Sequence, residues 1–141
     1  MVSMKENLLK VNHPLAPLTV EEVQTAIGIL KSEKALGEKV RFPTVTLREP
    51  VKEIVLNSVE GSEFPREAFF VVLENEEVKT FEAIVSLNTG TVISYEEIEG
   101  VQPSIMPEEF IECENIVKAN PEFLAALAKR GIDNADLVMV D

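Results

Sequence analysis

The sequence contains no tryptophan and only one cysteine, one histidine and one tyrosine among its 141 residues. A single cysteine cannot form an intrachain disulfide, and it offers no paired spacing of the kind that binds structural zinc. A metal site built from imidazoles normally takes two or three histidines, so His13 alone predicts no closed copper or zinc site. We therefore expect neither a disulfide framework nor a histidine-based metal centre.

Basic residues are also scarce, because 13 Lys and Arg stand against 25 Asp and Glu, which gives a net charge of −12. Such a charge repels a phosphate backbone, so we expect no nucleic-acid partner. No Lys or Arg lies between Phe81 and Val117, whereas eight glutamates do. We interpret this region as a solvated acidic face, with a docking patch for a basic surface as the alternative.

Long apolar runs are missing as well. No run approaches the roughly 18 residues that a membrane span needs, and the charges scattered through Met1 to Lys10 are not typical of a secretory signal. We expect no membrane insertion and a cytoplasmic location. The length fits one ordinary domain, or one small domain with a fragment of a second.

Residues 13–23, HPLAPLTVEEV, have the pattern of a helix entry. Thr19 can cap the helix and Glu22, three residues later, can complete a capping box. Apolar residues then recur at helical spacing until Gly37, a residue that often ends helices. The pattern predicts a helix from Val20 to Leu36.

Strand-forming residues dominate the next segment. Pro43 lies in the first run and indicates an edge strand or a bulge, and a short helix is expected to begin at Pro50. The predicted strands are Lys39–Arg48, Arg66–Leu73, Val78–Leu87 and Thr91–Ile98. Apolar and polar residues alternate in the third run, so one face of the sheet must be covered by a helix. The fold class is therefore α+β, with a helix packed on a curled four-stranded antiparallel sheet.

The remainder of the chain has a different pattern. A proline-bearing linker precedes two predicted helices, which Asn120-Pro121 separates, and the second helix ends at Gly131. The last apolar run, Leu137–Val140, has strand character. We divide the chain into a lead-in (1–12), a domain (13–100) and a helical segment with a terminal strand (101–141).

No residue set has the spacing of a catalytic or ligand site. We interpret His13 as a lid residue packing beside the first helix, with weak ligation or titration near neutral pH as the alternative. Cys113 lies between two glutamates, which favour half-buried packing over a reactive thiol. The pairs Glu108/Glu109 and Glu96/Glu97 are adjacent in sequence, so their side chains diverge. We predict no catalytic, cofactor-binding or metal-binding residue.

Several blocks of the sequence together resemble a known family. They are HPLAPLTVEEV, VTLREPVKEIVL, REAFFVVLENEEVKTFEAIVSLNTGTVISYEEIEGVQPSI, PEEF, CENIVKANPEFLAALAKRGI and DNADLVMVD. In this order they resemble the N-terminal accessory region of copper-containing primary amine oxidases. Residues 13 to about 99 resemble the complete second N-terminal domain, and residues 101–141 resemble the opening of the third.

The resemblance implies a cystatin-like fold and a parent enzyme that converts a primary amine, O2 and water into an aldehyde, ammonia and H2O2. In full-length members copper and topaquinone carry this chemistry, and both belong to a C-terminal domain. The chain has neither the three copper-binding histidines nor the tyrosine motif, because Tyr95 lies in Ser94-Tyr95-Glu96. We expect no cofactor in this chain and no oxidase activity from it alone.

Two other functions are alternatives to the role that the resemblance implies. A free-standing cystatin-like interaction protein is one, although Asn88-Thr89-Gly90 replaces the Gln-x-Val-x-Gly hairpin of inhibitory cystatins. A hydrolase or isomerase with a cavity in the sheet is the other. The expected partners are a catalytic amine oxidase domain or a second copy of the chain. The second copy would bind the strand at Leu137–Val140 and the uncovered apolar helix surface of Phe110, Val117, Phe123 and Leu127.

Overall fold

The computed structural model describes residues 12–59, 61–74 and 78–140. Most of the lead-in and residues 75–77 of the first predicted hairpin turn therefore lie outside the described residues. The chain divides into two compact units after Pro103, three residues beyond the boundary expected at residue 100. Each unit is described by itself.

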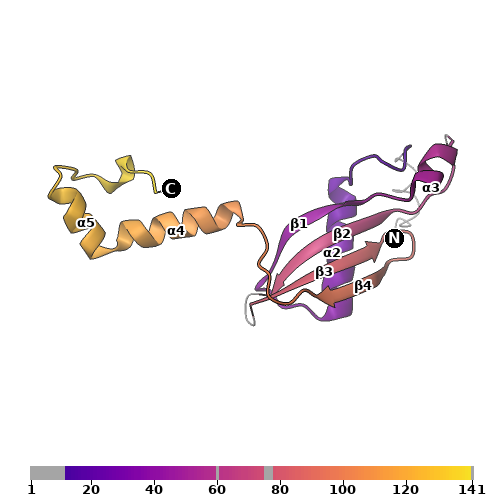
Figure 1. Ribbon diagram of the computed structural model, residues 1–141, viewed down its shortest axis with the longest axis horizontal. Helices are drawn as coiled ribbons and strands as arrows, with labels where there is room; N and C mark the ends of the chain where they lie inside the picture. Colours follow the sequence, from indigo (N-terminus) through magenta and orange to yellow (C-terminus); the bar gives the residue numbers. More distant parts are fainter. Residues whose placement is uncertain (1–11, 60, 75–77, 141) are drawn as a thin grey trace. The chain divides into compact units, whose positions relative to one another are not determined.

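The first unit is a helix on an antiparallel sheet. Its elements are α2 (Val20–Lys34), β1 (Val40–Arg48), α3 (Lys52–Asn57), β2 (Glu67–Glu74), β3 (Lys79–Ser86) and β4 (Thr91–Glu97). The strands lie in the order β1-β2-β3-β4, and every neighbouring pair is antiparallel. Helix α2 crosses one face of this sheet (Figure 1). The predicted α+β fold class is confirmed.

The core lies between α2 and the face of the sheet that α2 covers. Its buried members are Ala26, Leu30, Val40, Ala68, Phe70, Val72, Ala83, Val85 and Leu87. On β2 and β3 these residues alternate with outward-facing ones, as the period of two for a half-buried strand requires. Phe42 packs edge-on against Phe70 with ring centroids 5.7 Å apart.

The end of α2 differs from the prediction. The helix stops at Lys34, and Ala35 takes the left-handed conformation with φ of 50°. Gly37, predicted as the stop, is therefore two residues too late. The short helix also begins later than Pro50, at Lys52. A proline and a glycine mark such boundaries only approximately, because hydrogen bonding fixes the exact residue.

The prediction for Pro43 is confirmed. The register between β1 and β2 shifts between Arg41 and Thr44, and β1 is an edge strand. Proline lacks the N–H that a ladder needs, so a bulge at the sheet edge accommodates it.

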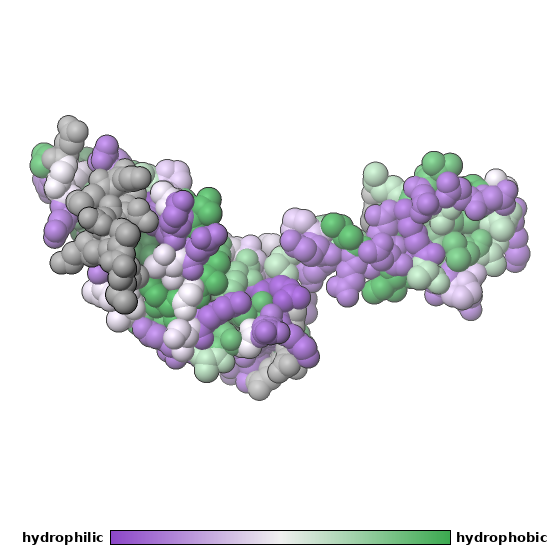
Figure 2. Space-filling view, turned by 180° about the vertical axis from the view of Figure 1, so that it is seen from behind, coloured by the Kyte–Doolittle hydropathy of each residue, from purple (hydrophilic) through white to green (hydrophobic). Residues whose placement is uncertain are grey.

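The second unit contains the two predicted helices, α4 (Pro107–Ala119) and α5 (Pro121–Ala128). Asn120 Oδ1 caps α5 by accepting hydrogen bonds from the N–H groups of Glu122 and Phe123. Apolar residues on α4 are exposed, among them Phe110 and Ile116, and apolar atoms are visible on the surface of this unit in Figure 2. Leu127, which was predicted to be uncovered, is buried. Among the described residues, no helix combines the length and apolarity that crossing a membrane requires.

The predicted terminal strand is wrong. Residues Ala135–Leu137 form a 3-10 turn, with Asn134 Oδ1 accepting a hydrogen bond from the N–H of Asp136, and residues 138–140 have no regular structure. A strand needs a neighbour to complete its hydrogen bonds, and no strand is described in this unit. The apolar pattern alone could not supply that neighbour.

Candidate functional site

The most strongly organised polar cluster joins α2, β2 and the segment before α2. It begins with a capping box in which the Glu22 N–H donates to Thr19 Oγ1 (3.2 Å) and the Thr19 N–H donates to Glu22 Oε2 (2.8 Å). This part of the cluster was predicted from the sequence. Arg66, which directly precedes β2, completes it with Nε and Nη2 donating to Glu22 Oε1 and Oε2 at 2.7 and 2.8 Å.

Arg66 also fixes the chain before the helix. Its Nη1 donates to the carbonyl of Ala16 (2.6 Å) and its Nη2 to that of Pro17 (2.7 Å). Arg66 is 1% exposed and Glu22 is 8% exposed. A two-pronged Arg–carboxylate pair of this kind is charge-assisted and geometrically specific. The cluster therefore locks residues 16–17, the start of α2 and the start of β2 into one arrangement.

The pKa of Glu22 lies below its usual value. Burial by itself would raise this pKa, but the hydrogen bonds and the charge of Arg66 and the Thr19 N–H outweigh the burial. Glu22 is thus held as a carboxylate that accepts hydrogen bonds and donates none. A carboxylate fixed in this state is a structural anchor and a poor proton donor.

His13 is exposed and does not pack beside the helix as predicted. Its Nδ1 accepts a hydrogen bond from the Leu15 N–H at 3.1 Å, and its carbonyl accepts one from the Ala16 N–H. The neighbouring Pro14 is the buried residue instead. His13 therefore shapes a turn, because its imidazole substitutes for a backbone acceptor.

A second polar group surrounds the only tyrosine. Tyr95 Oη donates to Glu74 Oε1 at 2.7 Å, the ring stacks on Phe81 with centroids 4.6 Å apart, and Lys34 Nζ lies 5.4 Å from the ring centroid. Burial, together with the hydrogen bond and charge of Glu74, raises the pKa of Tyr95 well above its ordinary value. The phenol is therefore held neutral.

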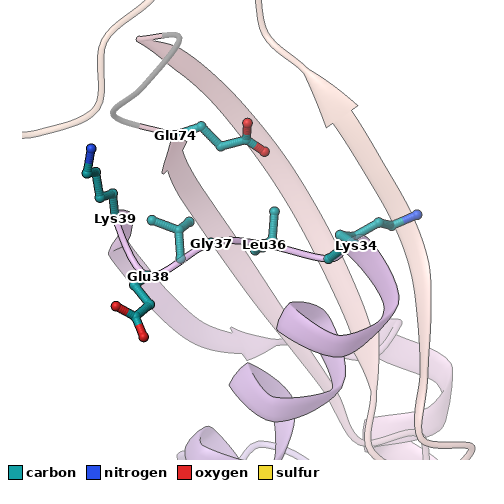
Figure 3. A pocket seen from close by; sticks show the side chains of 8 residues that line it. Lys34, Leu36, Gly37, Glu38, Lys39 and Glu74 are labelled. Atoms are coloured by element: carbon teal, nitrogen blue, oxygen red, sulfur yellow. The ribbon is translucent and has the colours of Figure 1, made fainter.

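Glu74 also borders a hollow of about 530 Å³ beside the turn that follows α2. In Figure 3 Glu74 reaches across this hollow from the end of β2, opposite Leu36, Glu38 and Lys39. The described residues that line it include no Ser, Cys or His, so they offer no nucleophile with an adjacent base.

The other candidate residues remain apart. Cys113 is exposed on α4, which corrects the prediction of half-buried packing. The neighbouring glutamates say nothing about burial, and the apolar residues Phe110 and Ile116 on the same helix are exposed as well. Among residues 12–140 as described, no group of three or more His, Cys, Asp or Glu is placed to hold a metal ion.

Arg66 is the residue that sequence reasoning missed. It lies 44 positions from Glu22, and nothing in the local pattern of REAFFVVL indicates its partner. The available signal was the position of this charged residue next to a strand whose alternate residues are apolar and buried. A charge in such a place needs a partner of opposite charge.

Comparison with known proteins decides the family. The family model described as "Copper amine oxidase, N2 domain" matches residues 13–98. The chain belongs to the copper amine oxidase family. This confirms the resemblance inferred from the sequence.

Similar copper amine oxidases are much longer than this chain. A primary amine oxidase of Arthrobacter sp. (strain P1) is 44% identical over 134 residues, which cover 94% of this chain and 20% of the relative. A primary amine oxidase of Klebsiella aerogenes is 30% identical over 130 residues, which cover 90% of this chain and 17% of the relative. The chain thus spans about a fifth of the length of the relatives that it matches.

The fold agrees with this assignment. The crystal structure of a copper-containing benzylamine oxidase from Hansenula polymorpha superposes with a TM-score of 0.68. The match covers 83% of this chain and 19% of that chain at 18% identity. The arrangement of a helix on a four-stranded sheet is therefore that of an amine oxidase N-terminal domain.

The described residues do not fit the copper and topaquinone that the family implies. The imidazole of His13 accepts a backbone hydrogen bond, and among the described residues it belongs to no group of three or more His, Cys, Asp or Glu that could hold a metal ion. The hydroxyl of Tyr95 is committed to Glu74 on the sheet. We assign no step of amine oxidation to these residues.

Proposed function

We propose that this chain is a non-catalytic N-terminal accessory module of a copper amine oxidase. One observation carries the proposal: the N2 domain model matches residues 13–98, in a chain that covers about a fifth of its relatives. The parent enzyme would oxidise a primary amine with O2 and water to an aldehyde, ammonia and H2O2. Copper and topaquinone would be held by sequence outside these 141 residues, and residues 101–141 would form the opening of the third N-terminal domain.

The geometry supports a scaffold role. The best-ordered polar groups, Arg66 with Glu22 and Tyr95 with Glu74, satisfy each other inside the unit. Groups that act on a substrate need free donors, acceptors or nucleophiles that converge on a pocket. These groups contribute rigidity to the module.

A free-standing interaction protein with a cystatin-like scaffold is less well supported. The turn that would present an inhibitory hairpin is tied to its own unit, since Asn88 Oδ1 accepts from the Arg66 N–H and Asn88 Nδ2 donates to the Phe64 carbonyl. The Gly90 N–H donates to the Ser86 carbonyl. A turn held from both sides has few backbone groups left for a partner.

In this proposal the partner of the chain is the catalytic region of an amine oxidase polypeptide, and the two act together in the cytoplasm. A domain exchange tests the role. The 134 matching residues of the Arthrobacter primary amine oxidase would be replaced by the corresponding residues of this chain. The exchanged enzyme should fold and release peroxide from a primary amine. Failure to fold, or a folded enzyme without activity, would contradict the proposed role.

A further inference from the structure

The face of the sheet opposite α2 has a defined pattern of side chains. Strand register brings residues into rows across the four strands, and members of one row point to the same face. The row through the middle of β2 is Thr44, Val71, Glu82 and Glu96, and the row beside it is Thr46, Phe69, Ile84 and Ser94. These positions alternate with the buried core residues, so they face away from α2.

The centre of this outer face is apolar. Phe69, Val71 and Leu73 follow one another along β2, and Ile84 is the cross-strand partner of Phe69. All four are partly exposed. An antiparallel sheet face that remains in water normally carries polar side chains on a central strand, so this stripe needs another explanation.

The rim of the same face is polar and charged. Arg41 and Arg48 lie on β1 at one edge, and Glu82 and Glu96 are direct cross-strand neighbours towards the other edge. Like charges placed opposite each other weaken a sheet. An apolar stripe along β2, bordered by polar and charged side chains, is a composition found at protein–protein interfaces.

Within the first unit this face is covered at the two ends of β3, where Thr80 and Ser86 are buried, and is partly exposed between them. Helix α2 lies on the opposite side of the sheet (Figure 1). The carbonyl of Val101 accepts a hydrogen bond from Thr80 Oγ1, but Thr80 stands at the end of β3. Among residues 12–59, 61–74 and 78–103, α2 is the helix that packs on the sheet.

We propose that this outer face, centred on Phe69, Val71, Leu73 and Ile84, binds the catalytic region of the amine oxidase polypeptide. The inference rests on the proposed function and specifies its contact surface. About four fifths of each relative lies outside the part that this chain matches, which supplies a protein partner of sufficient size. The surface that it meets should be apolar at its centre, basic opposite Glu82 and Glu96, and acidic opposite Arg41.

Thiol labelling in the exchanged enzyme tests this contact. In a Cys113→Ser background, Val71→Cys places one thiol at the centre of the face, and Leu56→Cys places one on α3, where Leu56 is 71% exposed. Mass spectrometry of the labelled peptides separates these thiols from those of the relative. A maleimide should label Val71→Cys at least about tenfold more slowly in the exchanged enzyme than in the isolated chain. Leu56→Cys should react equally fast in both.

The possible outcomes separate the two proposals. An active exchanged enzyme in which Val71→Cys reacts as fast as in the isolated chain would overturn the contact surface and leave the accessory role standing. An exchanged enzyme that does not fold would overturn both. Protection of Val71→Cys in the isolated chain that disappears on dilution would mean that a second copy covers the face, against the proposal.

Discussion

Arg66 connects three separate parts of the first unit through one guanidinium group. It contacts Glu22 on α2 and the carbonyls of Ala16 and Pro17, and it precedes β2. The neighbouring ion pair between Arg48 and Glu67 is much more exposed, with 47% and 23% of the two side chains accessible. Buried and exposed pairs of the same chemistry can therefore be compared within this domain.

Replacing Arg66 by alanine should lower the free energy of unfolding by about 3–5 kcal/mol, because it leaves a buried carboxylate and two carbonyls without their donor. Arg48→Ala, the matched control, should cost about 1 kcal/mol or less because water screens that pair. Urea unfolding followed by circular dichroism measures both. Similar costs for the two variants would refute the role given to Arg66.

The single tyrosine gives a direct pH readout. The folded-state pKa of Tyr95 is raised above its ordinary value of 10.0. The stabilisation that belongs to its protonated form is therefore present below pH 10 and is lost as pH rises through the folded-state pKa. Phenolate absorbance in the folded chain should appear well above pH 10, and in urea it should appear near pH 10.

Glu74→Gln should lower the pKa of Tyr95 without restoring the ordinary value, because burial remains. Ionisation of folded wild-type chain near pH 10 would contradict this.

Some side-chain contacts could be predicted from the sequence and others could not, and the difference has a physical reason. Glu22 was predicted because its partner Thr19 is three residues away, whereas the Arg66 contact spans 44 positions. Tyr95 was placed on a strand, but its partner Glu74 depends on the register between strands. Local hydrogen bonds leave a mark in the sequence, and long-range ones depend on the assembled fold.

At the scale of elements, the boundary between α2 and β1 shows the same limit. Gly37 was predicted to end the helix, yet Ala35 adopts the left-handed conformation that glycine accepts more readily. The Leu36 N–H then donates to the Lys31 carbonyl, five residues back, so backbone hydrogen bonds close the helix end around Ala35 despite its side chain. In contrast, the edge position and bulge of β1 could be predicted from Pro43. Proline has no N–H to donate to a neighbouring strand, so within a sheet it is found mainly at edges and bulges.

Substitutions at these two positions test where α2 ends. Ala35→Gly should raise the free energy of unfolding by about 0.5–1 kcal/mol, because glycine removes the strain of a positive φ. Gly37→Ala should be neutral or stabilising by up to about 1 kcal/mol, since its φ is not positive and a Cβ would meet open space. Thermal or urea unfolding gives both values. Destabilisation by Gly37→Ala together with no gain from Ala35→Gly would place the helix stop at Gly37.

The whole molecule has two units, and all residues of the main core lie between Ala26 and Leu87. The hydrogen bond between Thr80 and the Val101 carbonyl also lies inside the first unit. This distribution matches the family assignment, in which the N2 domain covers residues 13–98. The fold class was available from the sequence because the helix and strand patterns are strongly periodic, and the family was available because several blocks resemble those of copper amine oxidases.

A chain ended after Pro103 should therefore fold without the second unit. It contains the complete core, the Arg66 cluster and the Tyr95 contact, so it should unfold in one cooperative transition and keep the raised pKa of Tyr95. Urea unfolding and the absorbance titration measure these two properties. A gradual transition, or a tyrosine that titrates near pH 10, would show that the core is incomplete.

The proposed accessory role means that these 141 residues support amine oxidation and do not perform it. The most direct measurement is peroxide release by the purified chain with added Cu²⁺, air and a primary amine. We expect peroxide no higher than in a control with Cu²⁺ and amine alone, and no quinone absorption band. Sustained peroxide release in proportion to the concentration of the chain would contradict it.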